Sequence, residues 1–170
     1  MSDPDLSLKL LLALNDRDQN IVSECAKDKS VKAWIDRKVE VKQIEEPILL
    51  FADHIKDITC LGFASACSNT RTVQQLVEAG ADVTATDSSG RTSLHWACES
   101  EVKFKQKVEY LLSCDALLIR ARDKYNNTPL HAAALRGNDT VISVLIQLHG
   151  AEVDERGFHG RTALHQACSK

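Results

Sequence analysis

The stretch that decides the fold is Asp123-Lys-Tyr-Asn-Asn-Thr-Pro-Leu-His-Ala-Ala-Ala-Leu-Arg-Gly137. Thr128 is a residue that caps the free backbone N–H groups at the start of a helix, and Pro129 fits the first helical turn because its missing N–H costs nothing there. Asn126 tolerates the positive φ that a tight turn needs. The run of alanines leaves room for a neighbouring helix to approach closely. The stretch therefore predicts a tight turn followed by a helix packed against other helices.

The same pattern recurs along the chain with a period of about 33 residues. Its Thr-x-Leu-His tetrad begins at Thr59, Thr92, Thr128 and Thr162, so the spacings are 33, 36 and 34 residues. Each tetrad leads into small residues, and the first three continue into a second apolar helix, such as Val141-Ile-x-x-Leu-Ile146. One such helix pair cannot bury its apolar face alone. The period therefore predicts a stack of helix pairs with a shared core.

The pattern resembles the ankyrin repeat, whose consensus reads D-x-x-G-x-T-P-L-H-x-A-A, a helix, then G-A-D-V. The resemblance implies an all-α solenoid of helix–turn–helix repeats joined by β-turn or hairpin loops. Repeats are expected at residues 57–86, 87–122, 123–155 and 156–170, the last one incomplete. Gly62 and Gly157 depart from the consensus His and Asp. Extra residues in the second repeat are expected near Glu101–Lys107 and Leu117–Ile119.

The N-terminal segment, residues 1–56, matches the repeat poorly and is expected to be a divergent helical cap. Two alternatives are open for it: a degenerate capping repeat followed by an insertion, or a separate helical segment packed on the end of the stack. Either would cover the apolar end of the first repeat, which an uncapped solenoid would expose. Its expected helices are Leu6–Asn15, Asn20–Lys27, Lys32–Val39 and Pro47–His54.

Composition limits the class of function. The chain has 170 residues and a formal net charge of −3. Lysines and arginines number twelve against thirteen acids in residues 57–170, so no basic face for nucleic acid is expected. No apolar run is long enough for membrane insertion. The six cysteines form no C-x-x-C pair and are interpreted as buried, reduced thiols, which favours an intracellular location, cytoplasmic with the nucleus as the alternative.

Two helical pairs, His95/Cys98 and His165/Cys168, have the spacing of zinc ligands, but each supplies only two ligands. The alternative interpretation, which we favour, is that the tetrad histidine bonds between neighbouring turns, since His131 lacks a cysteine partner. No phosphate-binding glycine loop or nucleophile elbow is present. Neither an enzymatic activity nor a metal or other cofactor is expected. The lysines of Val102–Val108 are interpreted as a solvated helix edge, with contact to an acidic partner as the alternative.

The resemblance implies a concave surface of turn tips and first-helix faces that binds a protein partner. Positions free of structural duty in the repeat register, rich in aromatic residues and arginine, are the candidate contacts. They are Ser88, Ser89, Arg91, Trp96, Glu99, Ser100, Lys124, Tyr125, Asn127, Leu135, Arg136, Phe158, His159, Arg161 and Gln166.

The leading hypothesis is therefore a non-enzymatic protein-interaction module acting through this concave groove. A second hypothesis is the N-terminal ankyrin region of a larger signalling protein, channel or scaffold. It follows from the incomplete last repeat, which would leave Ala163, Leu164 and Ala167 on an open apolar edge, and it expects further repeats or domains after Lys170. The third hypothesis is a metal protein or enzyme that uses the His/Cys pairs.

Overall fold

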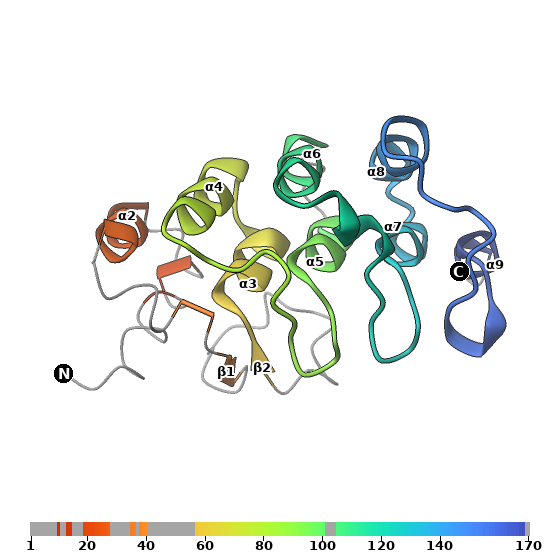
Figure 1. Cartoon of the computed structure of the whole chain (residues 1–170), viewed down its shortest axis with the longest axis horizontal. Coiled ribbons are helices and arrows are strands. Elements are labelled where there is room, and N and C mark those ends of the chain that lie inside the picture. The colour runs from red at the N-terminus through yellow and green to blue at the C-terminus, as the bar shows by residue number, and fades with distance from the viewer. Residues whose placement is uncertain are drawn as a thin grey trace.

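The structure is a computed structural model, and it describes residues 10, 13–14, 19–27, 35–36, 38–40, 57–100 and 105–168. Figure 1 shows the helices in two rows, with long turns that all project from the same side of the stack. The inner row consists of α3 (Cys60–Cys67), α5 (Ser93–Glu99), α7 (Pro129–Arg136) and α9 (Ala163–Ala167). The outer row consists of α4 (Thr70–Glu78), α6 (Lys105–Cys114) and α8 (Asp139–Ser143).

Three shorter elements complete the repeats. The π-helical segment η4 (Val144–Leu148) continues α8, and the 3-10 helix η3 (Ala116–Arg120) follows α6. The short helical turn η5 (Phe158–Gly160) lies at the tip of the last turn. The extra residues expected near Leu117–Ile119 are not found there, because the second helix ends nine residues before Asp87, Asp123 and Gly157 alike. Residues 101–104 lie outside the described part of the chain.

The helices begin and the turns bend where the sequence pattern places them. Thr59, Thr92, Thr128 and Thr162 are the N-cap residues of α3, α5, α7 and α9. The three turn residues two positions before Thr, which are Gly90, Asn126 and Gly160, have φ values of 76°, 64° and 70°. A left-handed backbone of this kind favours glycine and asparagine, so the turn prediction is confirmed.

The core lies between successive inner helices and under the outer ones. The tetrad leucines Leu61, Leu94 and Leu130 are buried, and so are the small residues that follow them, which allow α3, α5 and α7 to pack in series. Leu164 differs: it is 72% exposed, on the face of α9 that no described outer helix covers. Three sequence-based details were wrong: Lys107 is buried, and Cys114 and Cys168 are exposed.

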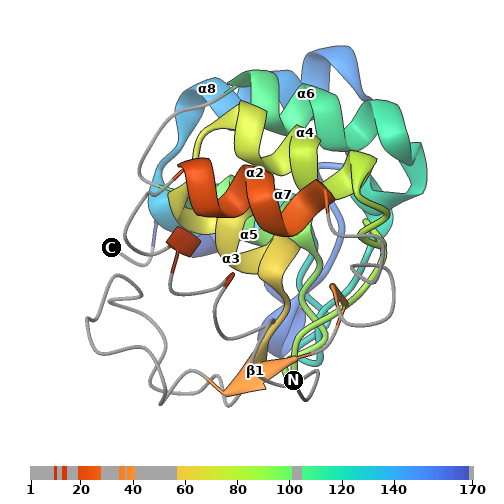
Figure 2. The same cartoon turned by 90° about the vertical axis from the view of Figure 1, so that its left-hand side faces the viewer.

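The described part of the N-terminal segment contains a helix, α2 (Gln19–Lys27), where Asn20–Lys27 was expected. Figure 2 shows α2 across the end of the stack, where it packs against α4. Leu10, Ala13 and Leu14 are helical and buried.

The expected helix Lys32–Val39 was wrong wherever the structure describes it, because Ile35 and Asp36 form a turn and Lys38 is not helical. Val39–Glu40 is instead a short strand, β1, paired antiparallel with β2 (Asp57–Ile58), so that Val39 faces Ile58. A β-branched valine fits this extended pairing. Residues 32–34 and 37, and the whole expected helix Pro47–His54, lie outside the described residues.

Candidate functional site

The turns are numbered by the repeat that they begin: the second turn is residues 87–91, the third 123–127 and the fourth 157–161. The second and third turns each close around an aspartate. Asp87 Oδ1 accepts hydrogen bonds from the backbone N–H groups of Ser89 (2.7 Å) and Arg91 (3.0 Å). Asp123 Oδ1 does the same for Tyr125 (2.9 Å) and Asn127 (2.8 Å). A carboxylate that accepts two backbone bonds satisfies groups that the tight turn cannot pair internally. The two turns are therefore held in one shape from within.

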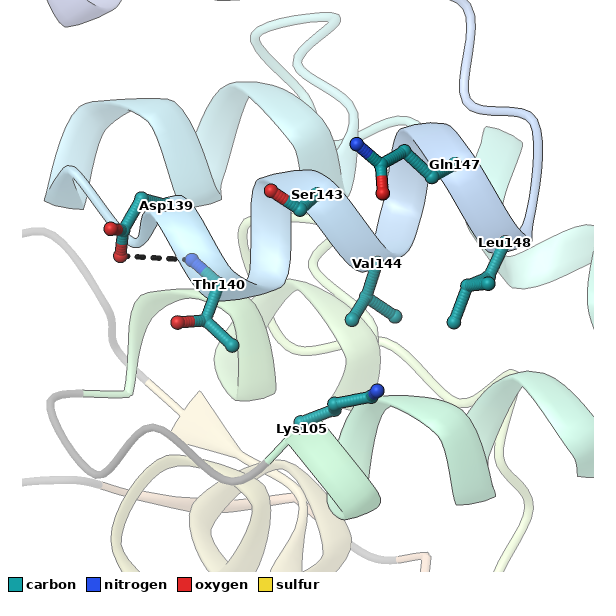
Figure 3. A pocket seen from close by; sticks show the side chains of 7 residues that line it. All are labelled: Lys105, Asp139, Thr140, Ser143, Val144, Gln147 and Leu148. Atoms are coloured by element: carbon teal, nitrogen blue, oxygen red, sulfur yellow. Dashed lines mark hydrogen bonds between the residues drawn. The ribbon is translucent and has the colours of Figure 1, made fainter.

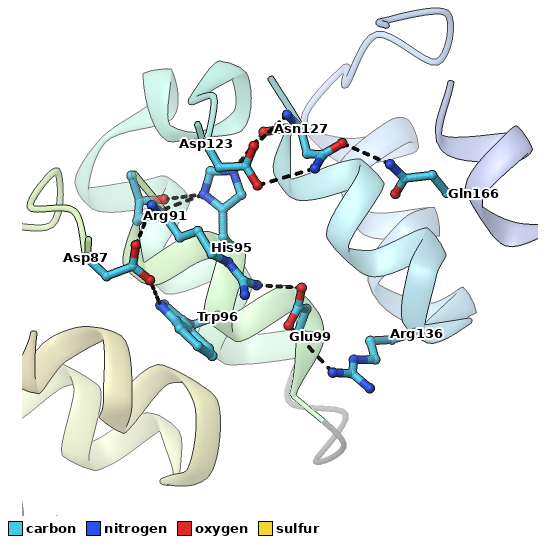
Figure 4. Close-up of polar contacts among 10 residues, drawn as sticks. Asp87, Arg91, His95, Trp96, Glu99, Asp123, Asn127, Arg136 and Gln166 are labelled. Atoms are coloured by element: carbon cyan, nitrogen blue, oxygen red, sulfur yellow. Dashed lines mark hydrogen bonds and ion pairs between the residues drawn. The ribbon is translucent and has the colours of Figure 1, made fainter. Parts of the chain in front are cut away.

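Hydrogen bonds also join each turn to the next. The Lys124 backbone N–H donates to the Ser89 carbonyl at 2.9 Å, and Asn126 Nδ2 donates to the Arg156 carbonyl at 2.9 Å. Asn127 Oδ1 accepts from the Phe158 N–H at 3.0 Å and from Gln166 Nε2 at 2.9 Å, the latter drawn in Figure 4. The turns thus form one continuous ladder, and side chains at their tips are presented at fixed spacing.

The tetrad histidines are part of this ladder. His95 Nδ1 lies 3.2 Å from the Thr92 backbone N–H, which donates to it, so Nε2 carries the proton and donates to the Asn127 carbonyl at 3.2 Å. His131 repeats the arrangement with the Arg161 carbonyl at 3.1 Å. Burial lowers the pKa of His95 to about 4, and burial likewise lowers the pKa of His131. Both rings are therefore neutral structural bridges at pH 7, as the tetrad interpretation expected.

A compact charged cluster extends along α5 from Asp87 and Trp96 to Glu99, which faces Arg136 of α7 (Figure 4). Trp96 is only 2% exposed, and its indole N–H donates to Asp87 Oδ2 at 3.1 Å. The Arg91 guanidinium lies 4.2 Å from the centre of the Trp96 ring, a cation–π distance, and Arg91 also pairs with Glu99 at 2.5 Å. Arg136 of α7 lies 3.7 Å from the other oxygen of Glu99. The cluster therefore ties neighbouring repeats together.

The fifteen residues assigned to the binding face from the sequence do not share one environment. Ser89, Trp96 and Ser100 are buried, so their assignment as partner contacts is corrected. Six further members are half-buried: Ser88, Arg91, Glu99, Asn127, Arg136 and Gln166. The exposed members are Lys124, Tyr125, Leu135, Phe158, His159 and Arg161.

The exposed members of the third and fourth turns meet. Tyr125 and Phe158 are 50% and 45% exposed, and their rings form an edge-to-face pair with centroids 5.6 Å apart. The His159 ring lies 4.0 Å from that of Phe158. We call the following set the tip surface: Lys124, Tyr125, Arg156, Phe158, His159 and Arg161. Arg156 was not among the residues predicted from the sequence, although the repeat register places it next to the exposed residues of the fourth turn.

The glycine at position 157, a departure from the consensus aspartate, has a structural reason. A Cβ atom at Gly157 would lie 2.5 Å from Asn127 Oδ1 and 2.9 Å from the His131 ring. The fourth turn therefore lacks its own carboxylate, and Asn127 reaches across from the third turn to accept the Phe158 N–H. This contact sets the position of Phe158 relative to Tyr125.

Lys107 is a second residue whose role the sequence did not reveal. Its side chain passes into the interior, and Nζ donates to the carbonyl of Ser65 near the end of α3 at 2.7 Å. Ser100 Oγ donates to the next carbonyl, that of Ala66, at 2.7 Å. The two side chains satisfy carbonyls that the end of a helix leaves open. Burial lowers the pKa of Lys107 to about 8.

Two of the grooves formed by the described residues lie away from the turns. One, of about 390 Å³, runs between α6 and the α8–η4 segment and has a mixed lining that includes Lys105, Ser143 and Gln147 (Figure 3). The other, of about 290 Å³, is almost wholly apolar and lies between α7, α8 and α9, with Leu130, Ile146 and Leu164 in its walls. The second groove is the open apolar edge expected from Ala163, Leu164 and Ala167, although Ala163 itself is buried.

Neither groove is lined by a cluster of metal-binding side chains. Among the residues that the structure describes, no three His, Cys, Asp or Glu side chains come together as a metal-binding group. Within the same residues, no helix has the length and apolar character needed to cross a membrane.

Comparison with known proteins places these features in a class. The fold is a stack of helix pairs with turns projecting from one side, and the model of the family described as "Ankyrin repeats (3 copies)" matches residues 8–119 and 104–170. The chain belongs to the ankyrin-repeat family. The ankyrin repeat is a non-catalytic fold that generally serves protein interaction. The match begins at residue 8, so it includes most of the divergent N-terminal segment.

Individual relatives are longer proteins of several kinds. The chain is 34% identical over 80 residues to "NAD-dependent deacetylase sir2B" of Dictyostelium discoideum, and the aligned stretch covers 46% of this chain and 10% of that protein. It is 35% identical over 89 residues to "Protein fem-1 homolog A-like" of Mus musculus, covering 52% and 13%. It is 27% identical over 158 residues to "Tyrosine-protein kinase HTK16" of Hydra vulgaris, covering 92% and 18%. The chain thus spans less than a fifth of each of these relatives.

Proposed function

We propose that this protein is a non-enzymatic interaction module that binds a protein partner through its concave groove, with the tip surface and Leu135 as the contact residues. The observation that carries the proposal is the exposed Tyr125–Phe158 pair on a rigid turn ladder. Aromatic side chains ordered before binding lose little entropy on contact, which is why they often dominate interface energies. The Asp87–Trp96–Arg91 cluster pairs within the second repeat and is not included in the contact residues.

The test uses two double variants of equal size. Tyr125→Ala with Phe158→Ala removes the aromatic pair, and Leu117→Ala with Leu148→Ala removes two exposed apolar side chains outside the tip surface. A partner is first isolated with the unaltered protein and identified, and affinities are then measured by isothermal titration calorimetry. Loss of two central contacts should weaken binding by at least about thirtyfold, or about 2 kcal/mol.

The control double variant should bind as the unaltered protein does. Far-ultraviolet circular dichroism must show equal helical content for all three proteins. If the tip variant keeps full affinity while the control loses it, the contact surface is elsewhere and this assignment is wrong.

A second candidate function concerns context rather than contacts. The relatives carry their matching stretches within far longer chains, which favours a recognition module of a larger signalling protein, channel or scaffold. An antibody raised against this chain tests it by immunoblot of the native protein. A band well above the 18.8 kDa of these 170 residues supports this candidate, and a single band at that mass contradicts it.

A further inference from the structure

The chemistry of the tip surface narrows the kind of partner it fits. Its centre is apolar and aromatic, because the Tyr125 and Phe158 rings pack edge to face and the His159 ring lies against Phe158. His159 holds a left-handed backbone with φ of 54°, which turns the ring outward at the tip of the fourth turn. The three rings form a small, solvent-facing platform for one apolar side chain.

Three cationic residues are neighbours of this platform in the chain, and one of them, Arg156, donates to the Gly160 carbonyl at 3.2 Å. Lys124, Arg156 and Arg161 are all exposed, one beside Tyr125 and two flanking the η5 turn. The carboxylates closest to them in the chain are already occupied. Asp123 accepts two backbone N–H groups of its own turn, and Glu155 forms an ion pair with Arg122. Asp123 keeps its charge while it accepts these bonds, but the tip surface itself carries three cations and no carboxylate.

The second turn lacks this character. Asp87 is buried, and the Arg91 side chain lies against Trp96 and pairs with Glu99 within the stack. Ser88, the half-buried residue of this turn, carries no charge. The three exposed cations thus lie on the turns that also carry the exposed aromatic rings, so one partner segment can contact both.

We propose that the tip surface recognises an acidic protein segment that carries one aromatic or large aliphatic anchor. The anchor packs on the Tyr125–Phe158 platform, and flanking Asp or Glu side chains lie near Lys124, Arg156 and Arg161. This inference rests on the proposed function and adds the class of partner. A nucleic acid fits the surface less well, because Glu152, Asp154 and Glu155 interrupt any cationic track long enough to follow a phosphate backbone.

The experiment is a selection with the full chain from a phage-displayed library of random 12-residue peptides at low salt. Peptides retained by the protein should carry at least two Asp or Glu residues close to a Phe, Trp, Tyr or Leu. Synthetic copies of the best binders are then measured by fluorescence anisotropy. Affinity should fall several-fold between 50 and 300 mM salt, because exposed charge pairs are screened over this range.

Two charge-reversed variants of equal net charge identify the surface. The tip-reversed variant combines Lys124→Glu, Arg156→Glu and Arg161→Glu, and its expected affinity loss for the acidic peptides is at least about tenfold, since three exposed pairs are lost. The control carries the same reversal on exposed residues of α2, α4 and α6, namely Lys27→Glu, Arg71→Glu and Lys105→Glu. It should bind within about twofold of the unaltered protein.

The possible results separate the two proposals. Selected peptides without an acidic bias, or equal losses in both reversed variants, overturn the acidic-segment inference while Tyr125→Ala/Phe158→Ala can still report on the proposed function. A 12-nucleotide fluorescent oligouridylate that binds more tightly than the peptides, and through the same cations, also overturns it. A selection that the aromatic double variant reproduces unchanged overturns both proposals.

Discussion

The buried tetrad histidine makes a sharp prediction about acid stability. His95 is almost fully buried with both ring nitrogens bonded, and burial lowers its pKa from 6.5 to about 4. The unfolded chain binds a proton near pH 6.5, whereas the folded chain does not until about pH 4. Below pH 6.5 protonation therefore favours the unfolded state, and stability is lost progressively as the pH falls toward 4.

The size of the effect follows from the shift. A difference of about 2.5 pKa units at 1.36 kcal/mol per unit gives about 3 kcal/mol in full, of which about 2 kcal/mol is lost between pH 7 and pH 5. His131, whose pKa is also lowered by burial, adds a loss of the same sign. Asp87 acts oppositely, because burial raises its pKa and protonation of the folded state then adds stability at lower pH.

Urea unfolding followed by circular dichroism at half-unit steps from pH 7.5 to pH 4.5 measures this dependence. The matched variant is His95→Gln, which keeps a side-chain acceptor three residues after Thr92, as capping boxes allow, but does not titrate. The free energy of unfolding of the unaltered protein minus that of His95→Gln isolates the contribution of His95. This difference should decrease by about 2 kcal/mol from pH 7 to pH 5. Parallel pH profiles for the two proteins would refute the structural role given to this histidine.

Three further stability changes follow from single contacts, each measured by urea unfolding at pH 7. Gly157→Ala should cost about 1–3 kcal/mol, because the added methyl group displaces the Asn127 side chain; a neutral result would contradict the close approach. Trp96→Phe should cost about 1–3 kcal/mol, since it leaves a buried carboxylate oxygen without its indole donor. Leu145→Ala should cost about 2–5 kcal/mol, whereas Leu148→Ala, 61% exposed, should change stability by less than about 0.5 kcal/mol.

The repeat register was predictable because it rests on local chemistry. Thr128 as a cap, Pro129 in the first turn and Asn126 at positive φ each act within a few residues, and all three are found where the sequence placed them. The helix expected to end at Val39 failed for the opposite reason. Its strand depends on Ile58, a partner 19 residues away, and no local periodicity encodes such a pairing.

The candidate site was predictable only in part, for the same physical reason. Tyr125 and Phe158 lie at turn tips, where exposure follows from the register alone. Whether Trp96 faces solvent depends on the neighbouring repeat, and the role of Asn127 depends on Phe158 and Gln166, more than 30 residues further along. The burial of Lys107 could not be predicted from its own stretch of sequence, because its ammonium group is satisfied by the carbonyl of Ser65 near the end of α3.

The central claim is that the third and fourth turn tips contact a protein partner, and site-specific photo-crosslinking tests it most directly. Phe158 is replaced by p-benzoylphenylalanine in one sample, and Leu148, an exposed residue of η4, is replaced in the other. After irradiation in cells, a covalent adduct with one protein is expected from position 158 and not from position 148. An adduct that forms from position 148 alone would contradict the account.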